Sequence, residues 1–180
     1  LKSPLFSGEV TRLAIDLNRS IGNPSQFCDE LFASDERIKA DLIAKVFLPF
    51  RSQALAAIEK EINDGKTVVH LSVHSFTKVY QGKRREVDLG ILFDPARTQE
   101  ALLGKRWTKA LAAVLPDHTV QTNQPYAGVE DGHVTALRRL FPADRYIGIE
   151  VELSQELELD SDSESWGRIL CKSLQRALAG

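Results

Sequence analysis

Polar side chains that can bind ligands or take part in catalysis recur at or just after the predicted ends of β-strands. In α/β folds, ligands collect in the crevice at the carboxyl ends of the strands. A site built from several strand ends is therefore the strongest local indication of function in this sequence. The residues concerned are Asp16, Asn18, Arg19, His74, Ser75, Asn123, Tyr126, Glu150 and Glu152.

Two histidines lie on one predicted strand, residues 67–74. His70 and His74 share a face of that strand but are about 13 Å apart, so a single metal ion cannot bind both. The mid-strand position of His70 favours a structural, hydrogen-bonded histidine. His74 ends the strand and opens a loop, where a role in binding and simple exposure are equally well supported by the residues alone.

Glu150 and Glu152 share a face of the predicted strand 146–153, about 7 Å apart. Burying two carboxylates requires a compensating cation, metal or proton. The alternative is an exposed edge strand that runs into the acidic segment 156–164, which contains no basic residue and is predicted to be a solvated loop. From the residues alone, both interpretations remain open.

Two arginines are candidates for binding a carboxylate. Arg19 follows Asn18 at the end of the first predicted strand, and a guanidinium can bind a carboxylate through two parallel hydrogen bonds. A salt-bridged loop is nevertheless the more ordinary interpretation of that segment. Arg85 belongs to a basic stretch that is most simply solvated, although it follows the His74 loop and could reach a site there. Tyr126 could donate a phenolic proton or merely pack.

Strands that alternate with helices predict an α/β protein whose mainly parallel or mixed sheet is covered on both faces, a three-layer sandwich. We expect one domain over residues 1–180. Residues 67–74 are predicted to form a central strand, Ser34 to cap the first helix, and Pro49 to end or kink it. The predicted strands are 11–18, 67–74, 87–93, 119–123 and 146–153; the predicted helices are 35–47, 51–63, 98–115, 133–141 and 163–178, with Gly65 as a stop signal.

Composition excludes several classes of function. The 180 residues carry 23 basic and 25 acidic side chains, which does not indicate a nucleic-acid surface. No apolar run approaches the roughly 18 residues of a membrane span. Cys28 and Cys171 lie far apart without paired zinc spacing, so we expect free thiols in a reducing, cytoplasmic compartment. Neither a Gly-rich phosphate loop nor a Gly-x-Ser-x-Gly motif is present.

Five segments of the chain together resemble the N-formylglutamate amidohydrolase family. They occur in the order and at the spacing of that family and cover nearly the whole chain. The family in turn resembles the zinc carboxypeptidases, which implies a carboxypeptidase-like α/β fold. The segments are TRLAIDLNRS, VVHLSVHSFTKVY, RREVDLGILFDPAR, TNQPYAGVEDG and RYIGIEVELSQ.

The resemblance implies a metal-dependent reaction and assigns roles to several residues. Zinc, or another divalent metal, would be bound by His74. Glu152 would be the general base, with Glu150 as the alternative, and Tyr126 would hydrogen-bond the developing oxyanion. The imidazole, a carboxyl group and a guanidinium would then lie around one cleft.

For the substrate, the resemblance implies a carboxylate bound chiefly by Arg19. Asp16 would position the Arg19 loop or His74 rather than bind metal. The expected substrate is a small N-acyl amino acid, most simply N-formyl-L-glutamate, which would be hydrolysed to glutamate and formate. The substrate-binding residues implied are Asn18, Arg19, Arg85, Ser75 and Asn123.

Two alternatives to this reaction stay open: a carboxypeptidase-like peptide hydrolase, and a truncated domain that binds a carboxylate without turnover. The family's amino-terminal Glu-His-x-Gly-Asn-like motif has no counterpart here, and the chain starts at Leu1 without a methionine. We therefore expect the natural beginning to be missing, His74 to be the only clear metal ligand, and metal binding to be weak. The sequence indicates no nucleic-acid or membrane partner and leaves the oligomeric state open.

Overall fold

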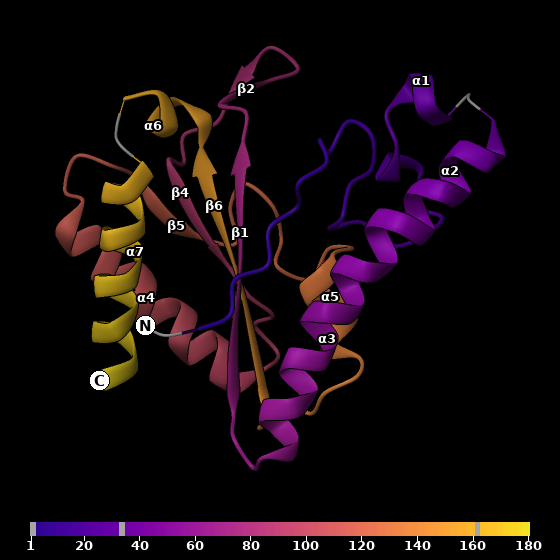
Figure 1. Cartoon of the computed structure of the whole chain (residues 1–180). Coiled ribbons are helices and arrows are strands. Elements are labelled where there is room, and N and C mark those ends of the chain that lie inside the picture. The colour runs from indigo at the N-terminus through magenta and orange to yellow at the C-terminus, as the bar shows by residue number, and fades with distance from the viewer. Residues whose placement is uncertain (1–2, 33–34, 161–162) are drawn as a thin grey trace. The chain divides into compact units, whose positions relative to one another are not determined.

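Residues 3–32, 35–160 and 163–180 are described by a computed structural model (Figure 1). The chain divides into two units, and each is considered by itself. We call Leu1–Val68 with Asp131–Arg145 the helical unit, and Val69–Glu130 with Tyr146–Gly180 the sheet unit.

The sheet unit is built on a four-stranded sheet with the order β1-β6-β4-β5. Strand β4 is antiparallel to β6 and parallel to β5, and Figure 1 shows the arrowheads of β1 and β6 at the same end. The predicted α/β class and mixed sheet are confirmed. The strands are β1 (Val68–Phe76), β4 (Leu89–Leu92), β5 (Val120–Thr122) and β6 (Tyr146–Ser154).

The prediction that residues 67–74 form a central strand is wrong, because β1 lies at an edge of this sheet. High β-propensity does not distinguish an edge strand from a central one. The alternation of polar and apolar residues does not distinguish them either, because the central strand β6 alternates in the same way with Glu150 and Glu152. It indicates only that one face of the sheet is polar and the other apolar.

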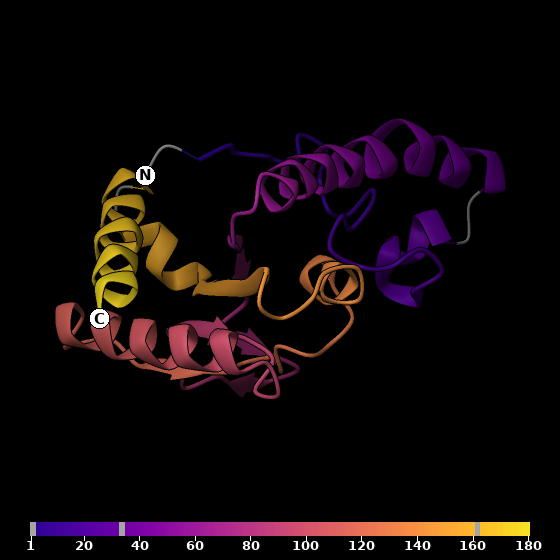
Figure 2. The ribbon, with the colours of Figure 1, turned by 90° about the horizontal axis from the view of Figure 1, so that it is seen from below.

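One face of the sheet carries the core of this unit. Leu89 and Ile91 of β4 pack there with Trp107 and Leu111, all fully buried. Two long helices that contact each other pack on this face, and Figure 2 shows the end of one of them, at the label C, next to the other. A hydrogen bond of 2.9 Å from Trp107 Nε1 to Ser173 Oγ joins them. These helices are α4 (Thr98–Val114) and α7 (Ser163–Ala179), close to their predicted ranges.

The other face of the sheet is polar. Because side chains alternate along a strand, His70 and His74 of β1 point away from the side that carries Val69 and Leu71, which pack on the core. His70 Nδ1 lies 2.7 Å from the Tyr146 hydroxyl, which confirms the predicted hydrogen-bonded histidine.

The basic stretch after β1 forms part of a hairpin, which the sequence did not predict. Strands β2 (Val79–Tyr80) and β3 (Lys83–Arg84) pair antiparallel around Gln81 and Gly82, whose φ angles are 49° and 73°. Positive φ at both central residues suits the right-handed twist of a short hairpin.

Two ion pairs anchor the hairpin to the sheet unit. The ammonium of Lys78, a buried residue, donates to the Val87 carbonyl at 2.9 Å and pairs with Asp88. Arg84 binds the Glu156 carboxylate through two bonds of 2.9 and 2.7 Å. Glu156 lies in α6 (Gln155–Asp160), so the predicted solvated loop is partly helical.

Helix α6 begins where Ser154 Oγ accepts from the Glu156 N–H at 3.3 Å, which is the interaction of an N-cap. An acidic residue in the first turn also interacts favourably with the helix dipole. The acidic composition that indicated a loop therefore equally fits a helix start.

The helical unit contains a helical run whose hydrogen bonding changes just before Pro49, in line with the expectation that this proline ends or kinks the helix. Residues 43–47 form a π-helical turn, and Leu48 N–H donates to the Ile43 carbonyl across it. Because Pro49 then lies in the first turn of the next helix, its missing N–H breaks no bond of that helix. The helices are α1 (Asp29–Phe32), α2 (Glu36–Leu42), α3 (Leu48–Asn63) and the short α5 (His133–Arg138).

The caps of these helices agree only in part with the sequence. Asp35 caps α2 by accepting from Arg37 N–H at 2.9 Å, whereas the predicted cap, Ser34, lies outside the described residues. Gly65 follows α3 with a φ of 82°, as the predicted stop signal requires. No helix in the described part of the chain is long and apolar enough to cross a membrane.

The predicted strand 11–18 is wrong, because these residues form turns and bends. The Asp16 carboxylate accepts from Asn18 N–H at 2.8 Å, and Asp16 N–H donates to the Gln26 carbonyl at 2.8 Å. Asp and Asn side chains that bond to nearby main chain compete with strand pairing. The apolar alternation reflects the burial of Ile15 in an irregular segment.

Candidate functional site

The polar face of the sheet brings His74 next to the two glutamates of β6. His74 Nε2 lies 2.9 Å from Ser72 Oγ and 3.6 Å from Glu150 Oε2. Glu150 and Glu152 are only 6% and 7% exposed. The expected proximity of the imidazole to a carboxyl group is therefore confirmed, whereas the predicted exposed-strand alternative for the glutamates is wrong.

The charges of this cluster favour a cation or a proton. Glu150 and Glu152 are two residues apart on one face, so their carboxyl groups repel each other when both are ionised. A protonated His74 would form an ion pair with Glu150. The same arrangement can take up a proton from a water molecule, which is the chemistry of a general base.

A loop after β5 lies against the same face of the sheet. The Asn123 side-chain oxygen accepts from Phe93 N–H at 3.0 Å and Gly128 N–H at 3.2 Å. Gly90, which pairs with Glu152 across the two strands, lies directly under the Gln124 carbonyl. The loop that carries Tyr126 is thus fixed beside the strand position of Glu152.

We expect Gly90→Ala to destabilise the protein by about 1–3 kcal/mol, the usual effect of overpacking. A Cβ at Gly90 would lie 1.8 Å from the Gln124 carbonyl oxygen, so the loop would have to move. Gly167→Ala is the matched control, since nothing lies within 4 Å of its Cβ position in α7. Urea denaturation compares the two, and equal midpoints would show that the loop does not need this approach.

Arg85 and Tyr126 are in direct contact. Arg85 Nη1 donates to the Tyr126 hydroxyl at 3.1 Å and to the Thr77 carbonyl at 3.2 Å. The guanidinium also lies over the rings of Tyr126, Tyr80 and Phe76, at 4.8, 4.9 and 5.6 Å from their centroids. Because the Tyr126 oxygen accepts from Arg85, its own proton is available to another acceptor.

Ser75 is a further predicted site residue in the sheet unit. It follows His74 on β1, so its side chain starts from the opposite face of the strand. Because its half-buried side chain starts on the face opposite to that of His74, Ser75 is less suited than His74 to contact a ligand on the polar face.

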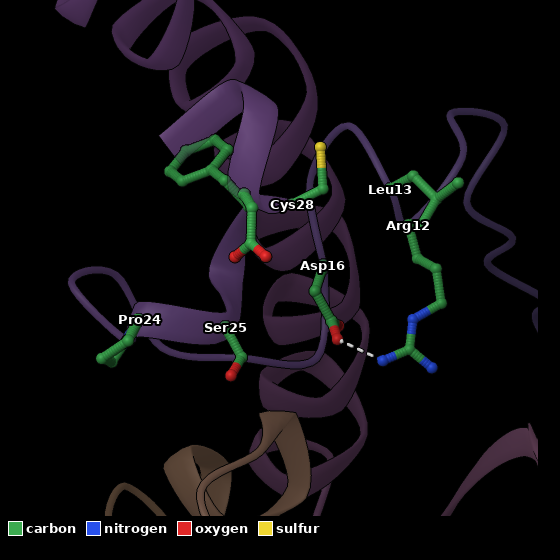
Figure 3. A pocket seen from close by; sticks show the side chains of 8 residues that line it. Arg12, Leu13, Asp16, Pro24, Ser25 and Cys28 are labelled. Atoms are coloured by element: carbon green, nitrogen blue, oxygen red, sulfur yellow. Dashed lines mark hydrogen bonds and ion pairs between the residues drawn. The ribbon is translucent and has the colours of Figure 1, made fainter. Parts of the chain in front are cut away.

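Asp16 belongs to the helical unit, where it is held by its neighbours. Its carboxylate pairs with Arg12 at 3.0 Å and accepts from Asn18 N–H. Figure 3 shows Asp16 facing Arg12 beside a pocket of about 210 Å³, which Cys28 and Ser25 also line. Contact with the main chain of Asn18 suits the expected role in positioning the Arg19 loop.

The side-chain oxygen of Asn18 is hydrogen-bonded within the helical unit, whereas Arg19 keeps a donor that has no acceptor among the described residues. Asn18 Oδ1 accepts from His133 N–H at 2.7 Å, at the start of α5. Arg19 Nη1 donates to the Asp131 carbonyl at 2.8 Å. Among the described residues, nothing accepts a hydrogen bond from the buried Arg19 Nε. Arg19 therefore keeps donors for an anion such as a carboxylate.

Two residues that hold the Arg19 segment were missed by the sequence analysis. Arg51 donates to the main chain at residues 17–19, and the Asp131 carboxylate accepts from Ser20 and Asn23. Asp131 precedes Gly132 and was interpreted only as part of a turn. Arg51 is one of several charged residues on a helix, and nothing in its sequence context distinguishes it.

The described residues do not make a complete zinc site. A catalytic zinc normally has three protein ligands and one open position. Within residues 3–32, 35–160 and 163–180 there is no group of three or more His, Cys, Asp or Glu side chains that could hold a metal. His74 and Glu150 supply only a pair of neighbouring donors.

Comparison with known proteins identifies the class as amidohydrolase. Residues 1–158 match the family model described as N-formylglutamate amidohydrolase. The chain therefore belongs to the N-formylglutamate amidohydrolase family, as the five sequence segments indicated. No curated protein sequence matches the chain significantly.

Solved structures share the fold. A gene product of Agrobacterium tumefaciens superposes with a TM-score of 0.70 at 27% identity, covering 93% of this chain and 68% of its own. An N-formylglutamate amidohydrolase from Ralstonia eutropha gives a TM-score of 0.61 at 16% identity, covering 93% of this chain and 72% of its own. The second likeness supports the fold alone.

Proposed function

We propose that this amidohydrolase hydrolyses the amide bond of a small N-acyl amino acid with an acidic side chain. The simplest substrate is N-formyl-L-glutamate, which with water gives L-glutamate and formate. Besides the family, the observation that carries this proposal is the 3.6 Å approach of His74 Nε2 to Glu150 Oε2 on the face that also bears Glu152.

In this proposal, Glu152 is the general base and Glu150 is the partner that orients His74. Glu152 would take a proton from the attacking water and pass it to the departing amine. Its place beside the loop that carries Tyr126 supports this assignment. Tyr126 would donate its hydroxyl proton in a hydrogen bond to the carbonyl oxygen as negative charge develops there.

Arg19 would bind a substrate carboxylate. Its guanidinium is fixed through one Nη1 bond to the Asp131 carbonyl, which leaves further donors for the substrate. A two-point bond of this kind sets the orientation of the amide as well as its affinity. Arg85, which contacts the ring and hydroxyl of Tyr126, would support that tyrosine.

Dependence on a divalent metal, with zinc as the first candidate and His74 as a ligand, is part of the proposal. It follows from the family resemblance, whereas the described residues supply an incomplete ligand set. The roles of Glu152, Tyr126 and Arg19 are therefore assigned without reference to a bound ion.

The proposal is tested by measuring formate release from N-formyl-L-glutamate by the purified protein, with and without added zinc. Short peptides with a carboxyl-terminal glutamate serve as competing substrates. We expect formate release and weak zinc binding, which His74→Ala should weaken by more than about tenfold, since losing an outer-shell partner alone costs 10–100-fold. His118→Ala, in the same unit, is the control. Turnover of the peptides alone would contradict the proposed substrate, and unchanged zinc affinity in His74→Ala would remove His74 as a ligand.

A further inference from the structure

Arg51, near the start of α3, donates hydrogen bonds to three consecutive main-chain carbonyls. Its Nε donates to Leu17 O at 2.9 Å, and its Nη2 donates to Asn18 O at 3.0 Å and Arg19 O at 3.1 Å. The guanidinium lies 4.9 Å from the centroid of the Phe47 ring, one turn earlier. A planar group with five donors is suited to such a cluster of acceptors.

These carbonyls lie outside the helices and strands of the described chain. Residues 17–19 belong to neither a helix nor a strand there, so no ladder of main-chain bonds includes them. Main-chain carbonyls that are removed from water need another donor. Arg51 thus supplies, from a different element, donors to three carbonyls of the segment that carries Arg19.

Asp131 holds the other end of the same segment. Its carboxylate accepts from Ser20 N–H at 3.0 Å, Ser20 Oγ at 2.5 Å and Asn23 Nδ2 at 2.7 Å, while its carbonyl accepts from Arg19 Nη1. Burial acts to raise the pKa of Asp131, but the bonds from Ser20 and Asn23 and the charge of Arg19 outweigh it and hold that pKa below its ordinary value. The carboxylate thus remains charged near neutral pH.

Arg51 also remains charged, although it is partly desolvated. Burial lowers the pKa of Arg51 to about 10, against the opposing effect of Asp131 and Asp16. At neutral pH the guanidinium is still protonated and keeps its donors. Its charge is near Asp131, so the two anchors of the segment stabilise each other.

We propose that Arg51 is a positioning residue for substrate binding, which fixes the main chain of residues 17–19 so that Arg19 is held in place before a carboxylate arrives. The inference rests on the proposed function of Arg19. Arg51 itself does not need to touch the substrate. Its effect is preorganisation, because a segment that is ordered beforehand loses less entropy on binding.

The test compares Arg51→Gln and Arg51→Lys with Arg145→Gln. Arg145 is a matched control, since it also donates to a main-chain carbonyl, Gly65 O at 2.8 Å, in the helical unit. Thermal unfolding establishes that each variant is folded. Two readouts follow: kcat and KM for N-formyl-L-glutamate, and hydrogen exchange of the Asn18 and Ser20 amides, which donate to the carboxylates of Asp16 and Asp131.

In folded Arg51→Gln we expect faster exchange at both amides and a KM about 10–100-fold higher, with kcat within about twofold, because the segment must then be ordered when the substrate binds. Arg51→Lys should restore part of the affinity, since an ammonium can still donate to one or two carbonyls. Arg145→Gln should change neither readout. If Arg51→Gln fails to fold, Arg51→Lys carries the test, with an intermediate rise in KM.

Two contrary outcomes can be told apart. An unchanged KM in folded Arg51 variants, together with a raised KM in Arg19→Ala, would overturn the role of Arg51 and leave the proposed function intact. An unchanged KM in Arg19→Ala itself would overturn the carboxylate site, and the inference with it.

Discussion

Glu152→Gln is expected to lower kcat by about 10²–10⁴-fold while leaving KM nearly unchanged. The amide has almost the size of the carboxylate, so it keeps the packing of a residue that is 7% exposed. What it loses is the ability to accept a proton from water at neutral pH. Steady-state hydrolysis of N-formyl-L-glutamate measures the effect.

Two further variants are needed to interpret the effect of Glu152→Gln: a control and a test of the alternative base. Glu156→Gln removes an exposed carboxylate that binds Arg84 on the hairpin, and it should keep wild-type turnover. Glu150→Gln should act through His74 and lower activity less than Glu152→Gln. If Glu152→Gln turns over normally and Glu150→Gln does not, the base is Glu150.

Arg19→Ala is expected to raise KM for N-formyl-L-glutamate by about 10–150-fold, which corresponds to the roughly 1.5–3 kcal/mol of a hydrogen bond to a charged group. The lost guanidinium has a buried Nε with no acceptor in the described residues, so removing it leaves no protein partner unpaired at that atom. Arg19→Lys should recover only part of the affinity, because an ammonium cannot form the two parallel bonds.

An uncharged substrate tests whether the rise in KM of Arg19→Ala comes from losing a bond to the substrate carboxylate. N-formyl-L-leucinamide carries no carboxylate and should be hydrolysed by Arg19→Ala about as well as by the wild type. Arg145→Ala, in the same unit, controls for loss of positive charge. An equal loss on the uncharged substrate would mean that Arg19 supports the fold rather than the substrate.

The parts of the fold that the sequence predicted are those with strong local patterns. The apolar alternation around Ile91 and the helical period around Trp107 and Leu111 marked β4 and α4 correctly, because these faces form the core. Residues 11–18 failed for the opposite reason. Their alternation resembles a strand, but Asp16 and Asn18 satisfy the main chain locally and leave nothing to pair.

The site was predictable only where residue type and strand position coincide. His74 and the β6 glutamates stood out because they were predicted near the carboxyl ends of strands, where ligands collect in α/β folds. Arg51 could not stand out, since it bonds to main-chain carbonyls that any residue would supply, 32 to 34 positions away. Asp131 is 111 positions from Ser20, and only the folded chain brings them together.

Both tryptophans of the chain, Trp107 and Trp166, are buried in the sheet unit. Tryptophan fluorescence therefore reports on the sheet unit alone. Circular dichroism reports on the helices of both units, including α2 and α3 of the helical unit. A difference between the two optical signals during denaturation then reports on the helical unit without any label. The Gly90 and Arg51 variants, one in each unit, can thereby be assigned to the part of the molecule that they weaken.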